Sequence, residues 1–220
     1  LEKGLNMKKT FALAVTAIAL AVPTLSSAQF ANPLSGLMGG KSSGTATGAD
    51  MDAQQDSLVR TYVAAGANVQ NANGHIKEAL GIKAKSINDA ASSDSFSAKD
   101  IEAQDKANSA ESAAIAEALK SGATLKDEEA KAKYAQGLLS LAVGVKKYVD
   151  MSKEAQAFAS GMSTVSPLQI GKLQSGVYIA KNLPGNLTNL SNVLKGAIDF
   201  ARQNGVPVPD DATSALSASA

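Results

Sequence analysis

The stretch YAQGLLSLAVGVKKYV, residues 134–149, decides the fold of this chain. Twelve uncharged residues separate Lys133 from Lys146, so the stretch could enter a membrane, line a ligand pocket or lie inside a helical core. A helix that crosses a bilayer needs about 20 apolar residues, and twelve are too few. The apolar residues recur at spacings of four and three, which is typical of the buried face of an amphipathic helix.

This spacing continues on both sides of the stretch and predicts one long helix from Thr124 to about Ser160. Asp127, Glu128 and Glu129 lie in its first turn, where negative charge favours the positive end of the helix dipole. An isolated helix of this length is marginal in water, so it needs neighbours along most of its extent. Its predicted buried face consists of Tyr134, Leu138, Leu141, Val145, Tyr148, Ser152, Ala155, Ala159 and Met162.

Two glycines lie beside this buried face, Gly137 and Gly144, one heptad apart. Each costs about 1 kcal/mol of helix propensity relative to alanine, so each needs a packing reason. They could allow another helix to approach closely, or they could leave room for an apolar ligand such as an acyl chain. In the second case the candidate ligand groove comprises Tyr134, Gly137, Leu138, Leu141, Gly144, Val145 and Tyr148.

The rest of the chain predicts further helices. A first helix runs over residues 52–89, and a second over residues 97–120 with a buried face of alanines. Ser166-Pro167 begins a fourth helix, which ends at residues 182–185, and a fifth covers residues 186–204. No series of strands and turns is present. The alanines of the second helix are Ala103, Ala107, Ala110, Ala114 and Ala118, beside Ile101, Ile115 and Leu119.

These elements predict an all-α fold, an elongated up-down helical bundle of three long helices plus a broken pair formed by the fourth and fifth helices. Short connections favour antiparallel neighbours in such bundles. The bundle domain is expected over residues 51–205. A Gly/Ser-rich, flexible lead-in is expected over residues 29–50 and a disordered tail over residues 206–220.

Residues 7–28 read as a secretory signal peptide, with two lysines, a short apolar run and small residues before the expected cleavage after Ala28. Of 21 basic and 20 acidic residues, three and one lie in residues 1–28, which leaves 18 basic and 19 acidic residues. A nearly neutral mature chain has no field to attract nucleic acid. We expect a periplasmic or secreted protein with no nucleic-acid partner and no stable membrane span after signal cleavage.

The sequence offers little reactive chemistry. Cysteine is absent, which excludes disulfides and thiolate sites, and His75 is the single histidine. One histidine cannot supply a di-iron bundle site, and no nucleophile elbow surrounds a serine. We therefore expect no enzyme activity, no cofactor and no metal. Asn186-Leu187-Thr188 matches a glycosylation acceptor, to which we attach no function. The tyrosines Tyr62, Tyr134, Tyr148 and Tyr178 could line a pocket or could occupy layers of the bundle.

Three functions remain as hypotheses. The first is a non-enzymatic helical-bundle protein of the bacterial envelope that mediates protein–protein interaction or has a scaffold role, with an unknown protein partner or through self-association. The second is a carrier of an apolar small molecule or lipid in the bundle core. The third is a membrane-active helical protein.

Overall fold

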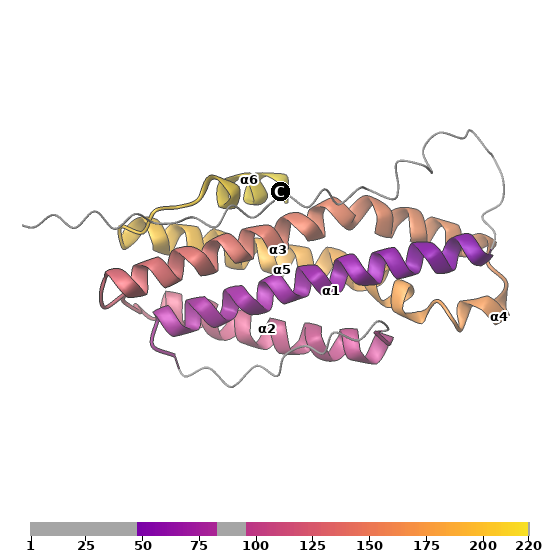
Figure 1. The fold of residues 1–220 in the computed structure, drawn as a ribbon, viewed down its shortest axis with the longest axis horizontal. Coiled ribbons are helices and arrows are strands. Elements are labelled where there is room, and N and C mark those ends of the chain that lie inside the picture. The colour runs from indigo at the N-terminus through magenta and orange to yellow at the C-terminus, as the bar shows by residue number, and fades with distance from the viewer. Residues whose placement is uncertain (1–47, 83–95, 220) are drawn as a thin grey trace, which may run out of the picture. The chain divides into compact units, whose positions relative to one another are not determined.

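A computed structural model describes residues 48–82 and 96–219, which form a bundle of helices without strands (Figure 1). The all-α bundle predicted from the sequence is confirmed. The predicted signal peptide, and the predicted lead-in up to residue 47, lie outside the described residues. The elements are α1 (Gly48–Ala79), α2 (Ala98–Lys120), α3 (Glu128–Gly161), the short 3₁₀ helix η2 (Met162–Thr164), α4 (Pro167–Ile170), α5 (Gln174–Gln203) and α6 (Asp210–Ala218).

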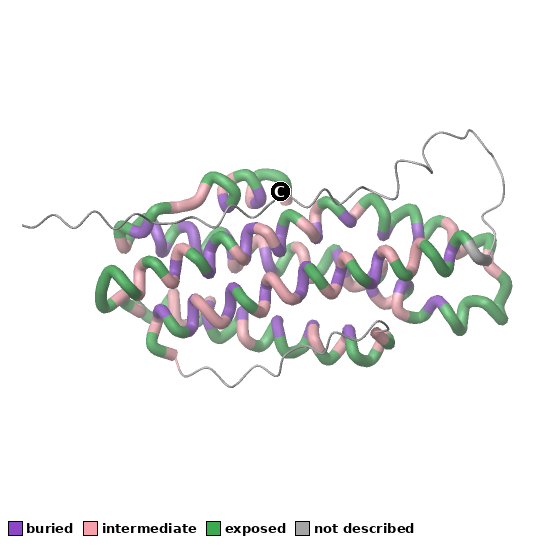
Figure 2. Tube along the Cα trace, viewed as in Figure 1, coloured by how far each residue is buried: buried purple, intermediate pink, exposed green. Residues whose placement is uncertain are grey.

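The uncharged stretch at residues 134–149 forms the centre of α3, the helix around which α1, α5 and α6 pack. Buried positions form a stripe along each long helix (Figure 2). The predicted buried face of α3 is confirmed from Tyr134 to Tyr148 and again at Ala155. Near the end of the helix, Met151 and Phe158 are buried instead of the smaller Ser152 and Ala159, because large apolar side chains gain more from burial.

The helices do not simply alternate in direction. Gly137 of α3 packs on Ile76 of α1 and Gly144 packs on Val69, so these two helices are antiparallel. Helix α5 is antiparallel to α3, since Gly176 meets Phe158 near one end and the Tyr134 hydroxyl donates to the Ala197 carbonyl near the other. The up-down arrangement therefore holds for these three helices.

Helix α2 runs parallel to its two neighbours, α1 and α5 (Figure 1). Tyr62 reaches Asp105, and further along both helices Asn73 reaches Ser112. The expectation of antiparallel neighbours rested on short connections. Eighteen residues separate Ala79 from Ala98, so the connection between α1 and α2 is not short.

Helix α1 ends about ten residues earlier than predicted. Gly81 has φ +67°, a left-handed conformation that glycine adopts without steric cost. The Ile82 amide then donates to the Lys77 carbonyl at 2.8 Å, which closes the helix end as a Schellman motif does. Apolar periodicity alone does not reveal such a stop.

The break predicted at residues 182–185 is wrong in position. Helix α5 passes through Pro184 without interruption, and the discontinuity lies between α4 and α5, at residues 171–173. Proline removes one helical hydrogen bond and disfavours a helix interior. Here Pro184 is exposed while Leu183 and Leu190 are buried, and packing of these leucines holds the helix together.

The predicted disordered tail is wrong for residues 210–218, which form α6. This helix packs on α3 and α5, and Ala212 and Ala215 are buried. Val206 is buried as well and anchors the connection after α5. An isolated helix of nine residues is marginal in water, so the stability of α6 comes mainly from this tertiary contact.

Helices α1 and α3 approach each other closely at two glycines of α3. A Cβ atom on Gly137 would lie 2.7 Å from Cγ1 of Ile76 and 3.1 Å from the carbonyl oxygen of Ala72. At Gly144 a Cβ would lie 3.0 Å from Cγ2 of Val69 and 3.3 Å from the Ala65 carbonyl oxygen. Both glycines therefore serve close helix approach, the first of the two explanations considered for them.

We expect Gly137→Ala to lower the free energy of unfolding by about 1–3 kcal/mol, because the added methyl group must displace α1. Gly196→Ala on the exposed face of α5 is the matched control, since nothing lies within 4 Å of its Cβ position. It should raise the stability by about 0.5–1 kcal/mol. Chemical denaturation measures both values, and equal effects would contradict this account of the α1–α3 contact.

Candidate functional site: the groove between α2 and α5

The ligand groove predicted on α3 is occupied by protein. All seven predicted residues are buried, and the space beside Gly137 and Gly144 is filled by side chains of α1. Six of the seven serve the contacts of α3 with its neighbours and do not line either pocket described below. Tyr148 is the exception, because it lines the first of the two pockets.

The buried face of α2 differs from the predicted row of alanines. Ala103, Ala107, Ala110 and Ala114 are exposed, and Ala118 and Leu119 are half-buried. The buried residues in the middle of the helix are Asp105, Asn108 and Ser112, with Ile101 and Ile115 at the two ends. These five residues keep the spacing of four and three. Helix α2 thus contacts the bundle through a row of three polar residues, called here the polar seam, with one isoleucine at each end.

Asp105 is the centre of the first polar cluster in this seam. Its Oδ2 atom accepts hydrogen bonds from the Tyr62 hydroxyl at 2.7 Å, the Tyr178 hydroxyl at 3.1 Å and the Asn186 amide at 3.0 Å. The Asn186 amide also donates to the Tyr62 oxygen at 2.6 Å. The ring of Tyr148 stands edge-on to the ring of Tyr62, with centroids 5.1 Å apart. Helices α1, α2, α3 and α5 all contribute to this cluster.

Burial controls the protonation of these groups. Desolvation raises the pKa of Asp105, and the three hydrogen-bond donors offset only part of this effect. Burial also raises the pKa of Tyr62, and the negative charge of Asp105 raises it further. Tyr62 and Tyr178 therefore remain protonated and can donate to the carboxylate.

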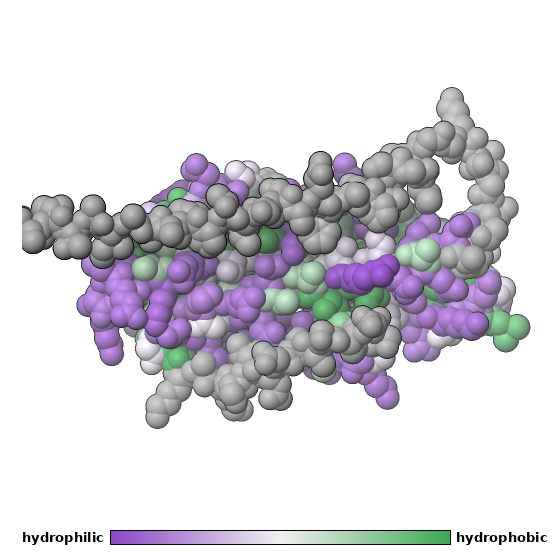
Figure 3. Space-filling view, in the orientation of Figure 1, coloured by the Kyte–Doolittle hydropathy of each residue, from purple (hydrophilic) through white to green (hydrophobic). Residues whose placement is uncertain are grey.

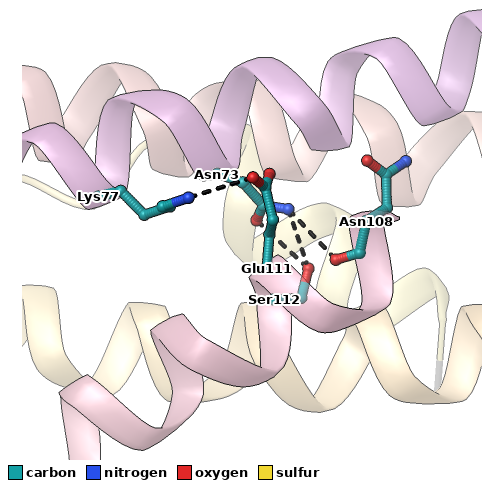
Figure 4. A network of polar contacts seen from close by, with 5 residues as sticks. All are labelled: Asn73, Lys77, Asn108, Glu111 and Ser112. Carbon is teal, nitrogen blue, oxygen red and sulfur yellow. Dashed lines mark hydrogen bonds and ion pairs between the residues drawn. The ribbon is translucent and has the colours of Figure 1, made fainter. Parts of the chain in front are cut away.

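A second polar cluster joins α2 to α1 (Figure 4). The Asn73 amide donates to the Ser112 hydroxyl at 3.2 Å and to the Asn108 carbonyl at 3.4 Å. Lys77 forms an ion pair with Glu111 at 3.1 Å. The Asn108 side-chain amide donates to the Gly66 carbonyl at 3.1 Å. Polar contacts therefore fix the register of α2 on α1.

Two adjoining pockets open along the line where α2 and α5 meet. The first, of about 330 Å³, is lined at its base by Asp105, Asn108, Tyr148 and Asn186. The second, of about 310 Å³, extends toward Gln203. Both include Asn192 and Val193, and the two adjoining pockets together are called here the α2–α5 groove. Its other lining residues are Val69, Ser109, Ser112, Ala113, Ala116, Leu119, Lys120, Asn189, Leu190, Gly196, Asp199 and Phe200.

The groove is suited to binding. Asn189 and Asn192 are exposed, and their amides make no hydrogen bond to another described residue. Each amide offers both a donor and an acceptor. The described residues contain no group of three or more His, Cys, Asp or Glu side chains that could hold a metal ion. His75 lies at the α1–α3 contact, beside Gly137, and is not among the residues that line the groove.

Sequence reasoning missed most of these residues. It noticed Asn186-Leu187-Thr188 only as a glycosylation acceptor. The sequence NLTNLSN at residues 186–192 repeats asparagine every third residue, which places three amides along one side of a helix. From this repeat, the polar lining of the groove along α5 could have been predicted. Asp105 gave a weaker signal, as one acidic residue within a helix rich in alanine.

Comparisons of the chain with protein-family models, curated proteins and solved structures gave no match. None of the described helices is long and apolar enough to cross a membrane. On the face seen in Figure 3, hydrophilic residues predominate, and hydrophobic atoms gather between α1 and α2 and at the α4 end. Leu168 of α4 is 91% exposed.

The raised pKa of Asp105 predicts a pH effect on stability. The folded protein binds the proton of Asp105 more tightly than the unfolded chain does. The stabilisation of the folded state by this proton is therefore complete below the ordinary pKa of about 3.9, and it is lost as the pH rises through the pKa of Asp105 in the folded protein. We expect the unfolding free energy of the wild type to fall relative to Asp105→Asn over this range. The change is about 1.4 kcal/mol for each tenfold difference in proton affinity. Urea denaturation at pH values from about 3 to about 8 measures this difference in unfolding free energy. A constant difference would refute the buried-carboxylate account.

Gln104 offers a test of the α2 contact. Its amide nitrogen and oxygen are both buried without a hydrogen-bond partner, against Gly66 of α1. Gln104→Leu removes two unsatisfied polar atoms and should raise the unfolding free energy by about 1–3 kcal/mol. Gln156→Leu on the exposed face of α3 is the control and should have little effect. Thermal and chemical denaturation compare the two, and equal changes would contradict the burial of the Gln104 amide.

Proposed function

We propose that this chain is a non-enzymatic interaction protein of the periplasm or the extracellular space, and that it holds an extended segment of a partner polypeptide in the α2–α5 groove. The observation that carries this proposal is the pair of adjoining open pockets, lined by asparagine amides without hydrogen bonds to described residues and by small residues.

The length of the groove supports a polypeptide occupant. It follows α5 from Asn186 to Gln203, which corresponds to about 25 Å at 1.5 Å per helical residue. An extended chain of about eight residues covers this distance at about 3.3 Å per residue. Small-molecule sites usually bury most of the ligand surface, whereas both pockets are open to solvent along the groove.

The lining of the groove supports recognition of a main chain. Ala113, Ala116 and Gly196 have small side chains, which leaves room for a backbone to approach. Asn189 and Asn192 can then pair with its N–H and C=O groups, as exposed sheet edges do in other peptide-binding proteins. Leu190, Val193 and Phe200 provide apolar surface for alternate side chains of the segment.

The alternative of an apolar carrier has less support, since the space beside Gly137 and Gly144 is filled by α1. A lipid-sized ligand would require α1 and α3 to separate, at the most extensive helix contact in the bundle.

The test is selection of binding peptides from a displayed library of random peptides, followed by affinity measurements with two variants. Ala113→Phe fills the groove and should weaken binding at least about tenfold, which corresponds to 1.4 kcal/mol. Ala114→Phe adds the same side chain to the neighbouring exposed position, outside the groove, and should leave the affinity unchanged. Selected peptides that bind both variants equally, or the absence of any specific peptide, would overturn the proposal.

A further inference from the structure

The Asp105 end of the groove has a feature that peptide binding alone does not require. Asp105 is 8% exposed, and every group that donates to it is neutral. A buried carboxylate normally pairs with a cation, because an uncompensated charge is costly to bury. Among the described residues no lysine or arginine lines this pocket. Lys106, next to Asp105 in sequence, pairs with Glu102, and Lys77 pairs with Glu111.

The unused hydrogen-bonding capacity around this pocket consists of acceptors. Asp105 receives its three hydrogen bonds on Oδ2, and its Oδ1 atom makes none to a described residue. Asn186 must turn its nitrogen toward the carboxylate, which cannot donate, so its carbonyl oxygen remains free. Asn108 turns its nitrogen toward the Gly66 carbonyl for the same reason. The three residues that carry these oxygens all line one pocket.

We propose that this pocket binds an aliphatic ammonium group, and that its source is a lysine side chain of the partner polypeptide. The proposal rests on the function proposed above. An ammonium group has three N–H donors, which match the oxygens of Asp105, Asn108 and Asn186. Its methylene chain would lie along Val69, Leu190 and Val193, which form the apolar wall of the pocket.

The geometry favours lysine over arginine. A guanidinium group binds a carboxylate best through both oxygens at once. Oδ2 of Asp105 already accepts three hydrogen bonds, so only the other oxygen is available. A compact ammonium group can use one carboxylate oxygen and two amide oxygens together.

The experiment has two arms. In the first, n-butylamine is titrated into the ¹⁵N-labelled protein, with 1-butanol as the uncharged control. Shifts centred on Asp105, Asn108 and Asn186 are expected with the amine alone. Asp105→Asn should weaken amine binding about ten- to a hundredfold. Ser109→Lys places a tethered ammonium at the pocket and should block the amine, while Ala110→Lys, exposed outside the groove, should not.

In the second arm, each lysine of a peptide selected as above is replaced in turn by norleucine or arginine. The proposal is supported if replacement of one peptide lysine lowers the affinity for the wild-type protein by about tenfold or more. The same replacement should not change the affinity for Asp105→Asn. Peptides that bind without a preference for lysine would overturn the partner's lysine as the source of the ammonium group and leave the peptide function intact. Amine binding without any peptide binding would overturn the lysine source and the peptide function together, and would point to a free amine as ligand. Absence of amine binding to the wild type and to Ala110→Lys would overturn the ammonium site.

Discussion

The close approach of α1 and α3 across Gly137 and Gly144 is the constraint on which the rest of the structure depends. Because two glycines face the backbone of α1 at Ala65 and Ala72, the two longest helices meet at these positions with little side-chain volume between them. Elsewhere α3 carries large side chains, and Tyr134 contacts Phe200 and Ala197 of α5 while Tyr148 stands edge-on to Tyr62 of α1. The hydrophobic core is thus concentrated around α3, and α2 contributes Ile101 and Ile115 to it.

The position of α2 explains why the candidate site is polar. Away from α3, this helix buries little apolar surface, and Asp105, Asn108 and Ser112 occupy the positions that isoleucine or leucine would take in a uniform bundle. Buried polar groups add less stability than apolar packing, but they demand specific partners. These polar residues also face α5, and the space between α2 and α5 is incompletely filled there, which produces the groove.

The sequence predicted the helices well where apolar periodicity and end signals agreed. The central face of α3, the start of α2 at Ser97 and the end of α5 at Asn204 were all readable. Failures arose where tertiary contacts outweighed local preference. Pro184 remains within α5 because the leucines around it are buried, and α6 exists because Ala212 and Ala215 pack on its neighbours. The buried face of α2 was misassigned because alanine suits exposed and buried helix positions equally, whereas the polar residues gave no sign of their partners on other helices.

The placement of α2 beside α1 and α5 has a consequence for how its buried carboxylate is paired. Asp105 bonds to Tyr62, 43 residues earlier in the chain, and to Asn186, 81 residues later. Neither helix alone provides a complete set of donors for this carboxylate. Asp105 therefore has its full set of donors only when α1 and α5 both lie beside α2, so the pairing of this carboxylate depends on contacts between distant parts of the chain. The cluster around Asn73 requires α1 alone, and two parts of the same helix thus depend on different neighbours.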